Sequence, residues 1–380
     1  MVATGKAVGT HKVKDIHFCI KRERNTALSF LFVLKHGKLT SIVIFYIINF
    51  AMIKEKYVKL SLLEKQKYIK LIKDKFETVL AKKLDLVRVS APIFVTKNSG
   101  LQDDLSGVER TVEFDIKKDG QTLQIVQSLA KWKRMALYKY QIPMHHGIYT
   151  DMTAIRRDDE MDELHSIYVD QWDWEKVIGR EDRTIDYLKQ TVSKIAECVV
   201  LTSKYLALHG FDGVKLQKKV YFVTSQQLLE MYPDLTPKQR EYEIVKKHKT
   251  VFIMQIGGAL TNGLPHDLRA PDYDDWTLNG DLMMYHEVLE TALEITSMGI
   301  RVDEKSLVEQ CKQANVEERL SYPFHRQILE GTLPLSIGGG IGQSRLCQLL
   351  LGRAHIGEVQ ASYWDTDNLE KCQQLGIELL

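Results

Sequence analysis

Cysteine is scarce in this chain of 380 residues, and its copies are scattered. The five cysteines form no closely spaced pair such as C-x-x-C, which excludes a disulfide framework and a zinc site built on paired thiolates. The twelve histidines include no H-E-x-x-H segment, so no structural metal is predicted. A reducing compartment, the cytoplasm, is therefore expected.

Proline, net charge and long apolar runs are also in short supply. There are only 8 prolines, and the 44% hydrophobic and 27% charged residues are typical of a globular chain rather than a collagen-like or disordered one. The 52 Lys and Arg residues nearly balance the 50 Asp and Glu residues, so the charge does not indicate a nucleic-acid partner.

The first 51 residues differ from the rest in charge and apolar pattern. They hold 8 Lys/Arg against 2 Asp/Glu. Their apolar runs, residues 27–34 and 42–53, are each shorter than the roughly 20 residues that a membrane-spanning helix needs. Two interpretations stay open: a basic targeting arm, or an accessory or artefactual extension ahead of Met52. Residues 52–380 are predicted to form one domain with no membrane segment.

The periodicity from Met52 onward predicts a mixture of helices and short strands. Apolar residues at three- and four-residue steps predict amphipathic helices over residues 54–83 and 182–208, and Gly210 suits a helix C-terminus. Because no regular strand–helix–strand repeat is present, an α+β fold with a largely antiparallel sheet is predicted. The strands are predicted at residues 86–94, 111–116, 122–126, 166–173, 220–224, 251–256 and 282–285.

A glycine-rich segment near the C-terminus, residues 336–345, reads SIGGGIGQSR. Its glycines allow the backbone to approach a ligand, and Arg345, just before a helix predicted over residues 346–351, favours an anion. A dinucleotide fingerprint is excluded, because the third glycine and a following βαβ unit are missing. Taken alone, the segment is equally compatible with a structural turn.

Carboxylates occur in otherwise apolar stretches. Asp281 and Glu294 need partners if they are buried, and magnesium bridging nucleotide phosphates is one such partner. The alternative for Glu294 is a solvated helix position. In another predicted strand, Gln171, Asp173 and Glu175 are two residues apart and share one face.

Six segments, in the expected order, make residues 52–380 resemble ammonia-dependent asparagine synthetase A, the aspartate:ammonia ligase that forms AMP. They are QDDLSG (102–107), SLAKWKR (128–134), residues 165–175, RAPDYDDW (269–276), SMGIR (297–301) and residues 337–345. The family's catalytic domain is similar to that of class II aminoacyl-tRNA synthetases. The resemblance therefore implies a mainly antiparallel sheet flanked by helices, and a homodimer.

The resemblance implies a reaction in two steps. The β-carboxylate of aspartate attacks the α-phosphorus of ATP, giving β-aspartyl-adenylate and pyrophosphate, and ammonia then displaces AMP to form asparagine. For ATP, the resemblance implies that Arg156 contacts the α-phosphate and that Arg345 and Ser297 belong to the nucleotide site. Asp281 and Glu294 would hold magnesium.

For the amino acid, the resemblance implies a pocket of both charge signs. Lys133 and Arg301 would hold carboxylates, and Asp173 and Asp274 would hold the ammonium group. Asp103 is implied as the proton acceptor on the ammonia side. The full set implied for aspartate is Ser128, Lys133, Gln171, Asp173, Asp274 and Arg301. The residues implied in catalysis are Asp103, Lys133, Arg156 and Arg345.

Two other features bear on the site. Four tryptophans lie in the matching segments, and we expect them to pack in the core rather than stack on a ligand. Only Thr277 and Leu278 separate Trp276 from Asn279, where familiar bacterial members of the family have a longer loop, so a lid over the nucleotide is expected to be shortened.

Rival functions remain to be weighed. A class II aminoacyl-tRNA synthetase is disfavoured, because residues 52–380 leave no room for an anticodon-binding domain. A non-catalytic sensor of amino acids or nucleotides on the same fold would be expected to lack the phosphate and magnesium residues, which are present. Free ammonia is the expected nitrogen donor, since no N-terminal nucleophilic cysteine precedes the core.

Overall fold

The computed structural model describes residues 12–13, 16–22, 28–34, 58–103, 105 and 109–380, and the chain divides into two compact units, residues 1–55 and 56–380. The first unit contains an antiparallel sheet of β1 (Lys12–Val13), β2 (Ile16–Arg22) and β3 (Leu28–Leu34). The predicted apolar run over residues 42–53 lies outside the described residues. In the part of the chain that is described, no helix is long and apolar enough to cross a membrane.

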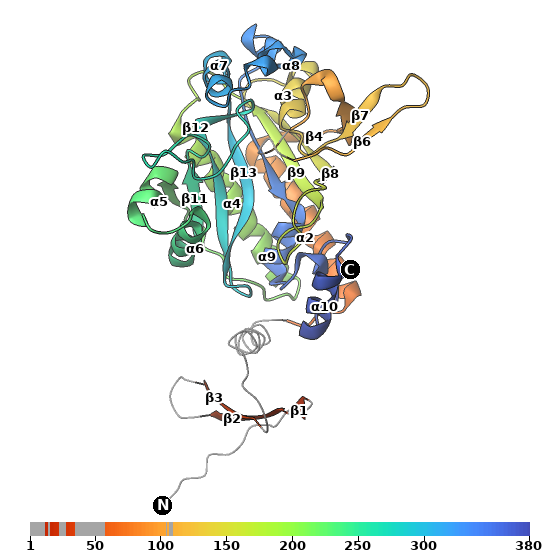
Figure 1. Cartoon of the computed structure of the whole chain (residues 1–380), viewed down its shortest axis with the longest axis vertical. Coiled ribbons are helices and arrows are strands. Elements are labelled where there is room, and N and C mark those ends of the chain that lie inside the picture. The colour runs from red at the N-terminus through yellow and green to blue at the C-terminus, as the bar shows by residue number, and fades with distance from the viewer. Residues whose placement is uncertain (1–11, 14–15, 23–27, 35–57, 104, 106–108) are drawn as a thin grey trace, which may run out of the picture. The chain divides into compact units, whose positions relative to one another are not determined.

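The second unit is built on an eight-stranded sheet with the order β10-β11-β12-β13-β14-β9-β8-β4 (Figure 1). The pairings are antiparallel from β11 to β8, and only the two outermost pairs, β10 with β11 and β4 with β8, are parallel. The strands are β4 (Leu86–Arg88), β8 (Gly147–Ile155), β9 (Tyr168–Val177), β10 (Tyr221–Thr224), β11 (Thr250–Met254), β12 (Asp274–His286), β13 (Thr291–Arg301) and β14 (Ser336–Gly342).

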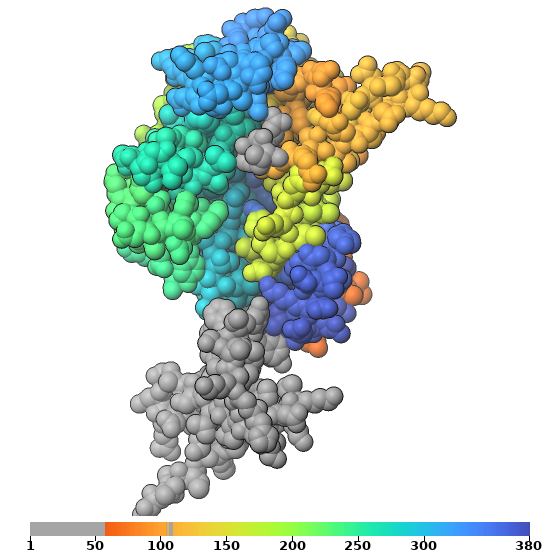
Figure 2. Space-filling view, viewed as in Figure 1, coloured from red at the N-terminus to blue at the C-terminus, as the bar shows by residue number. Residues whose placement is uncertain are grey.

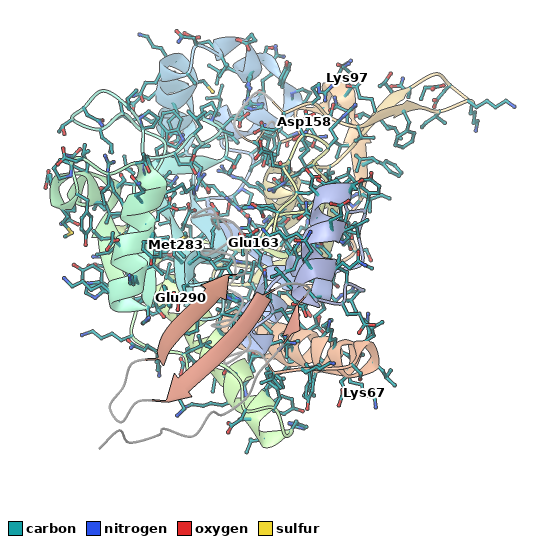
Figure 3. All side chains as sticks on the ribbon, turned by 60° about the horizontal axis from the view of Figure 1, so that its bottom comes forward. Lys67, Lys97, Asp158, Glu163, Met283 and Glu290 are labelled. Carbon is teal, nitrogen blue, oxygen red and sulfur yellow. The ribbon has the colours of Figure 1, made fainter. Side chains whose placement is uncertain are left out.

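One face of this sheet is apolar and is covered by helices α2 (Leu62–Leu84), α4 (Ile185–Leu208) and α9 (Gln343–Leu351). Trp172 and Trp174 point to this side, are fully buried and belong to the main core. The packing role expected for these two tryptophans is therefore confirmed. On the outer side of α2, Lys67 is exposed and points to solvent (Figure 3).

The opposite face is covered only in part. Helix α3 (Ala130–Lys139) packs on β9 and β14, and α5 (Ser225–Met231) and α6 (Pro237–His248) pack at the other end, near β10 to β13. Figure 1 shows α5 and α6 beside β11. Further helices are α7 (Glu304–Gln313), α8 (Pro323–Leu329) and α10 (Thr366–Leu375). The gap between α3 and α6 leaves part of the sheet face open for a site.

The helix ends follow from local capping. Ser61 and Glu64 form a capping box, so α2 begins at Leu62 and not at residue 54 as predicted. The predicted end of α4 is confirmed, since Gly210 adopts a φ of 85°. A capping box formed by Thr236 and Gln239 starts α6. Helix α9 begins directly after β14, at Gln343, earlier than predicted.

The strand predicted over residues 86–94 is wrong as one element. It consists of β4, in the large sheet, and β5 (Phe94–Thr96), which pairs with β7 (Thr122–Ile125) in a separate small sheet with β6 (Glu113–Asp115). Pro92 lies between the two strands and cannot donate a backbone hydrogen bond. The short connection from Trp276 to Asn279 lies within β12, at a register irregularity between Asp274 and Asn279.

Candidate active site

The open face of the sheet carries a row of glycines flanked by polar side chains. In the register of β14 with β9, Gly338, Gly340 and Gly342 lie opposite Glu175, Asp173 and Gln171. Opposed residues share a face, so the face predicted for the three polar residues is confirmed. A Cβ on Gly340 would lie 2.3 Å from Gln171 Oε1. Because the glycines have no side chains, they leave space on this face for the polar side chains of β9.

A β-bulge brings the two predicted magnesium ligands to the same face. Asp281 pairs with Ser297 and Met283 pairs with Glu294, so β13 contains one extra residue, Ile295, between these two pairs. In a regular strand, residues 294 and 297 would point to opposite faces, but the bulge turns Glu294 to the side of Asp281 and Ser297. The alternative that placed Glu294 on a solvated helix is wrong, since it lies in β13.

A cavity of about 320 Å³, here called the outer pocket, lies on this face. Figure 2 shows the hollow between the yellow-green segment after β8 and the cyan strands β12 and β13. Of the predicted site residues, the outer pocket is lined by Arg156, Gln171, Glu294, Ser297 and Arg345. Its walls come from the loop between β8 and β9, from β9 and β13, from the start of α9 and from the loop between β11 and β12.

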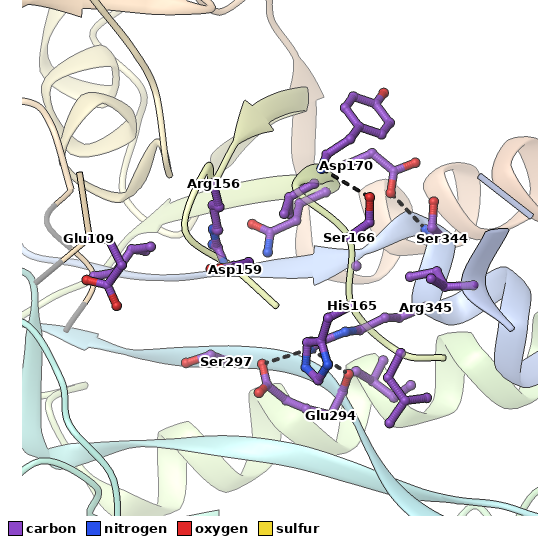
Figure 4. A pocket seen from close by; sticks show the side chains of 18 of the residues that line it. Glu109, Arg156, Asp159, His165, Ser166, Asp170, Glu294, Ser297, Ser344 and Arg345 are labelled. Carbon is purple, nitrogen blue, oxygen red and sulfur yellow. Dashed lines mark hydrogen bonds and ion pairs between the residues drawn. The ribbon is translucent and has the colours of Figure 1, made fainter. Parts of the chain in front are cut away.

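Two arginines of the outer pocket, Arg156 and Arg345, are loosely paired. Arg345 Nη1 lies 3.7 Å from Glu294 Oε1, and Figure 4 shows the two side chains pointing toward each other. Arg156 Nε donates to the carbonyl of Gln127 at 3.2 Å. Burial acts to raise the pKa of Glu294, but Arg345 and Arg269 outweigh burial and hold that pKa below its usual value. The pocket thus presents guanidinium groups that can turn to an anionic ligand.

Asp281 lies beside this pocket under Arg269, with which it forms an ion pair. Burial, with help from Glu294 and against the effect of Arg269, raises the pKa of Asp281 to about 6. Its Oδ1 atom is buried and has no hydrogen-bond partner among the described residues. A buried acceptor without a partner is suited to a hard cation, so Asp281 and Glu294 fit the predicted magnesium site.

A second group of charges, here called the inner cluster, lies buried on the same face and consists of Lys133, Asp173, Glu175, Asp274 and Arg301. Arg301 Nε and Nη2 donate to Glu175 at 2.9 and 2.7 Å, and Nη1 forms an ion pair with Asp274. Ser336 Oγ also donates to Glu175, at 2.7 Å. Burial acts to raise the pKa of Glu175, yet Arg301 outweighs it and lowers that pKa.

Lys133 links the inner cluster to the glycine row. Its Nζ forms an ion pair with Asp173 and donates to the carbonyl of Gly339 at 3.0 Å. The second oxygen of Asp173, Oδ2, is buried and has no hydrogen-bond partner in the described part of the chain. The cluster therefore retains an acceptor for an additional donor.

Asp103 lies on the loop before β6 and is 1% exposed. Ser128 Oγ donates to its Oδ2, and the backbone N–H of Leu105 donates to its Oδ1 at 2.9 Å. Burial raises the pKa of Asp103, although the nearby Lys131 counteracts the rise. Lys131 itself is paired with Asp272 at 2.7 Å. Asp103 is thus a carboxylate with an increased tendency to take up a proton.

Comparison with known proteins decides the family. The family model described as aspartate–ammonia ligase matches residues 63–376. The chain belongs to this family. An aspartate–ammonia ligase of Clostridium tetani is 53% identical over 329 residues, which are 86% of this chain and 96% of the relative. A Fusobacterium nucleatum aspartate–ammonia ligase is 54% identical over 322 residues, 84% of this chain and 98% of the relative. The resemblance inferred from six segments is therefore confirmed.

Solved structures extend the likeness to the fold alone. An asparaginyl-tRNA synthetase from Pyrococcus horikoshii, complexed with asparaginyl-adenylate, matches with a TM-score of 0.55 at 11% identity over 94% of this chain and 92% of that chain. An Entamoeba histolytica aspartyl-tRNA synthetase matches with a TM-score of 0.54 at 15% identity, over 96% of this chain and 88% of that chain. The predicted fold, an α+β class II synthetase-like domain, is confirmed for this aspartate–ammonia ligase family member.

Sequence reasoning gave no role to two residues of this ligase family member that the structure places in the site. The alternation of β9 predicts the face of Glu175, but only the structure shows that Glu175 accepts two hydrogen bonds from Arg301. Arg269 opens one of the six matching segments, and it is paired with Asp281 in the structure. Neither partner could be identified from spacing, because each pair joins different strands or loops.

Proposed function

We propose that the chain synthesises L-asparagine from L-aspartate and ammonia, with cleavage of ATP to AMP and pyrophosphate, through a β-aspartyl-adenylate. One observation carries this proposal: a single face of the sheet holds an arginine-lined pocket next to a buried cluster of both charge signs. A nucleotide and a small dicarboxylic amino acid would meet there, as the family membership leads us to expect.

The outer pocket would bind the nucleotide. Arg156 would contact the α-phosphate, and Arg345 and Ser297 would hold the rest of the nucleotide. Displacement at phosphorus is catalysed mainly by positioning and by stabilising charge, and arginines from separate walls of the pocket suit both tasks. Asp281 and Glu294 would hold magnesium, which would neutralise the negative charge of the phosphate oxygens.

The inner cluster would bind aspartate. The free Oδ2 of Asp173 would accept from the ammonium group, together with Asp274. Lys133 and Arg301 would face the carboxylates, and Gln171 and Ser128 complete the pocket. Because Arg301 and Lys133 are already paired, aspartate would have to exchange contacts within the cluster rather than enter an empty cavity.

Asp103 would act on the ammonia side. A nitrogen that attacks the adenylate must lose a proton, and a buried carboxylate with a raised pKa is a suitable acceptor. The hydrogen bonds from Ser128 and Leu105 would fix the direction of its oxygens. AMP then leaves, and asparagine is formed.

Product analysis tests the proposal. Purified protein with ATP, Mg²⁺, aspartate and ammonium should yield AMP and asparagine in equal amounts, without tRNA and without glutamine. Release of AMP only when tRNA is added would instead indicate a synthetase. No AMP under any condition would indicate a sensor on the same fold.

The homodimer and the cytoplasmic location are further parts of the proposal. The outermost strand β4 pairs with β8 alone in the large sheet, and its Val87 is 61% exposed, which offers an edge to a second copy. Light scattering of the purified full chain should give twice the mass of 43.8 kDa.

A further inference from the structure

The loop between β11 and β12 places a positively charged side chain, Arg269, on Asp281, one of the two carboxylates proposed to hold the metal. The Arg269 guanidinium forms an ion pair with Asp281 through Nη2, and the side chain is 14% exposed. Its Nη1 also donates to the carbonyl of Leu268 at 3.1 Å and lies 3.4 Å from Asp267 Oδ2. Arg269 is therefore the charge that neutralises a buried Asp281, and it does so from the wall of the outer pocket.

A metal ion and this guanidinium would compete for Asp281. Both are positive, and at the separation of two groups on one carboxylate their repulsion is substantial in a partly buried site. Only Oδ1 of Asp281 lacks a hydrogen-bond partner among the described residues. A cation at Oδ1 would share one carboxylate with Arg269, and the repulsion between the two positive charges would weaken the hold of Arg269 on Oδ2.

The outer pocket offers the displaced guanidinium of Arg269 an alternative partner once a nucleotide is bound. Asp267, Leu268 and Arg269 all line the outer pocket, as do Arg156 and Arg345. A triphosphate bound there would offer oxygens to a third guanidinium, and arginine forms strong charge-assisted hydrogen bonds with phosphate. The same movement would thus remove a competitor of the metal and add a ligand to the nucleotide.

Anchors on both sides limit this movement to a short span. On one side, the buried His266 Nε2 lies 3.1 Å from Glu241 Oε1 of α6. On the other side, Ala270 is 4% exposed, and its carbonyl accepts from Trp276 Nε1 at 3.4 Å. Between them, Asp267 is half-buried and Leu268 is exposed. Residues 267–269 can therefore rearrange while the rest of the loop stays attached.

We infer that Arg269 is a switching counterion. It holds Asp281 when metal and nucleotide are absent, and it transfers to the phosphates when both bind. This inference rests on the proposed nucleotide and magnesium site. If Arg269 switches in this way, the site binds a divalent cation weakly without ATP and strongly with ATP, because only the nucleotide offers Arg269 a new partner.

The test measures Mn²⁺ binding to the full chain, by electron paramagnetic resonance of free Mn²⁺, with and without ATP. Arg269→Ala should bind Mn²⁺ alone about tenfold more tightly than the wild type, because a like charge has been removed, and should bind ATP with Mn²⁺ about tenfold more weakly. Arg269→Lys keeps the charge and should bind bare Mn²⁺ like the wild type. The matched control is Arg180→Ala, which removes an exposed arginine paired with Glu304 and should change neither value.

Two results would overturn the inference. One is bare Mn²⁺ binding that is unchanged or weaker in a folded Arg269→Ala protein, as judged by circular dichroism. The other is an Asp281→Asn variant that binds Mn²⁺ as well as the wild type, because Asp281 would then not be a ligand. A wild type that binds Mn²⁺ through Asp281 but makes no asparagine would refute the proposed function instead, since metal binding does not depend on turnover.

Discussion

The outer pocket and the inner cluster share one face of one sheet, but their charged groups are held in different ways. In the outer pocket, Arg345 is 25% exposed and lies 3.7 Å from its carboxylate partner. In the inner cluster, Arg301 is 2% exposed and is bonded to two carboxylates. Loosely held charges can turn to a ligand at little cost, whereas buried pairs must be replaced contact by contact. We therefore expect mutations in the inner cluster to lower both stability and activity, and mutations in the outer pocket to lower activity alone.

The largest effect is expected from Arg301→Ala. Removing this side chain leaves Glu175 and Asp274 buried without their partner, so the free energy of unfolding should fall by about 3–5 kcal/mol, and aspartate-dependent ATP–pyrophosphate exchange should be lost. Urea denaturation and the exchange assay measure the two effects. Stability equal to that of the wild type would contradict the distinction between the regions.

Arg345→Ala should abolish activity and leave the fold intact. Exchange of pyrophosphate into ATP should fall by about 10³-fold, because a cation that stabilises developing charge is gone. The midpoint of urea denaturation should stay at the wild-type value, since the side chain is partly exposed and loosely paired. Unchanged exchange would refute the role proposed for Arg345.

Asp103→Asn should separate the two half-reactions. Asparagine formation should fall by about 10²-fold or more, the usual range for loss of a proton acceptor, while ATP–pyrophosphate exchange continues. Since burial raises the pKa of Asp103, the wild-type ammonia step should be fully present above that pKa and lost as the pH falls through it. An equal loss of exchange and amidation in the variant would assign Asp103 to the adenylation step instead.

Gly340→Ala should produce the smallest effect of this series. The new Cβ would meet the end of the Gln171 side chain, 2.3 Å from Oε1, which can move but would leave its place in the aspartate pocket. We expect the KM for aspartate to rise about tenfold and the free energy of unfolding to fall by about 1 kcal/mol, the low end of the cost of overpacking. Gly258→Ala is the matched control, because its added Cβ would have no neighbour within 4 Å.

The sequence was sufficient where local rules decide the structure. Gly210 was predicted to suit a helix C-terminus, and α4 ends just before it. The alternation of β9 placed Gln171 and Asp173 on one face, as the register shows. The resemblance of six segments identified the family and, through it, the fold.

Other features depend on contacts between distant parts of the chain. The division of residues 86–94 into two strands, β4 and β5, depends on pairing with different partners, β8 and β7. The partnership of Arg269 with Asp281 joins a loop to a strand. The periodicity of the sequence carries no information about such pairs. The charged residues of the site could therefore be predicted from the sequence, but not which of them pair with each other.

The bulge at Ile295 makes the site sensitive to chain length at a single point. In the hydrogen-bond register of β12 and β13, the bulge absorbs one extra residue and so keeps Glu294 on the face of Asp281. Deleting Ile295 would restore regular alternation and keep Glu294 on the face of Asp281, whereas inserting one further residue beside it would send the Glu294 carboxylate to the apolar side of the sheet. In this aspartate–ammonia ligase, one added residue beside the bulge would therefore separate the two carboxylates proposed to hold the metal, whereas the connection between Trp276 and Asn279 lies in the first part of β12, away from this point.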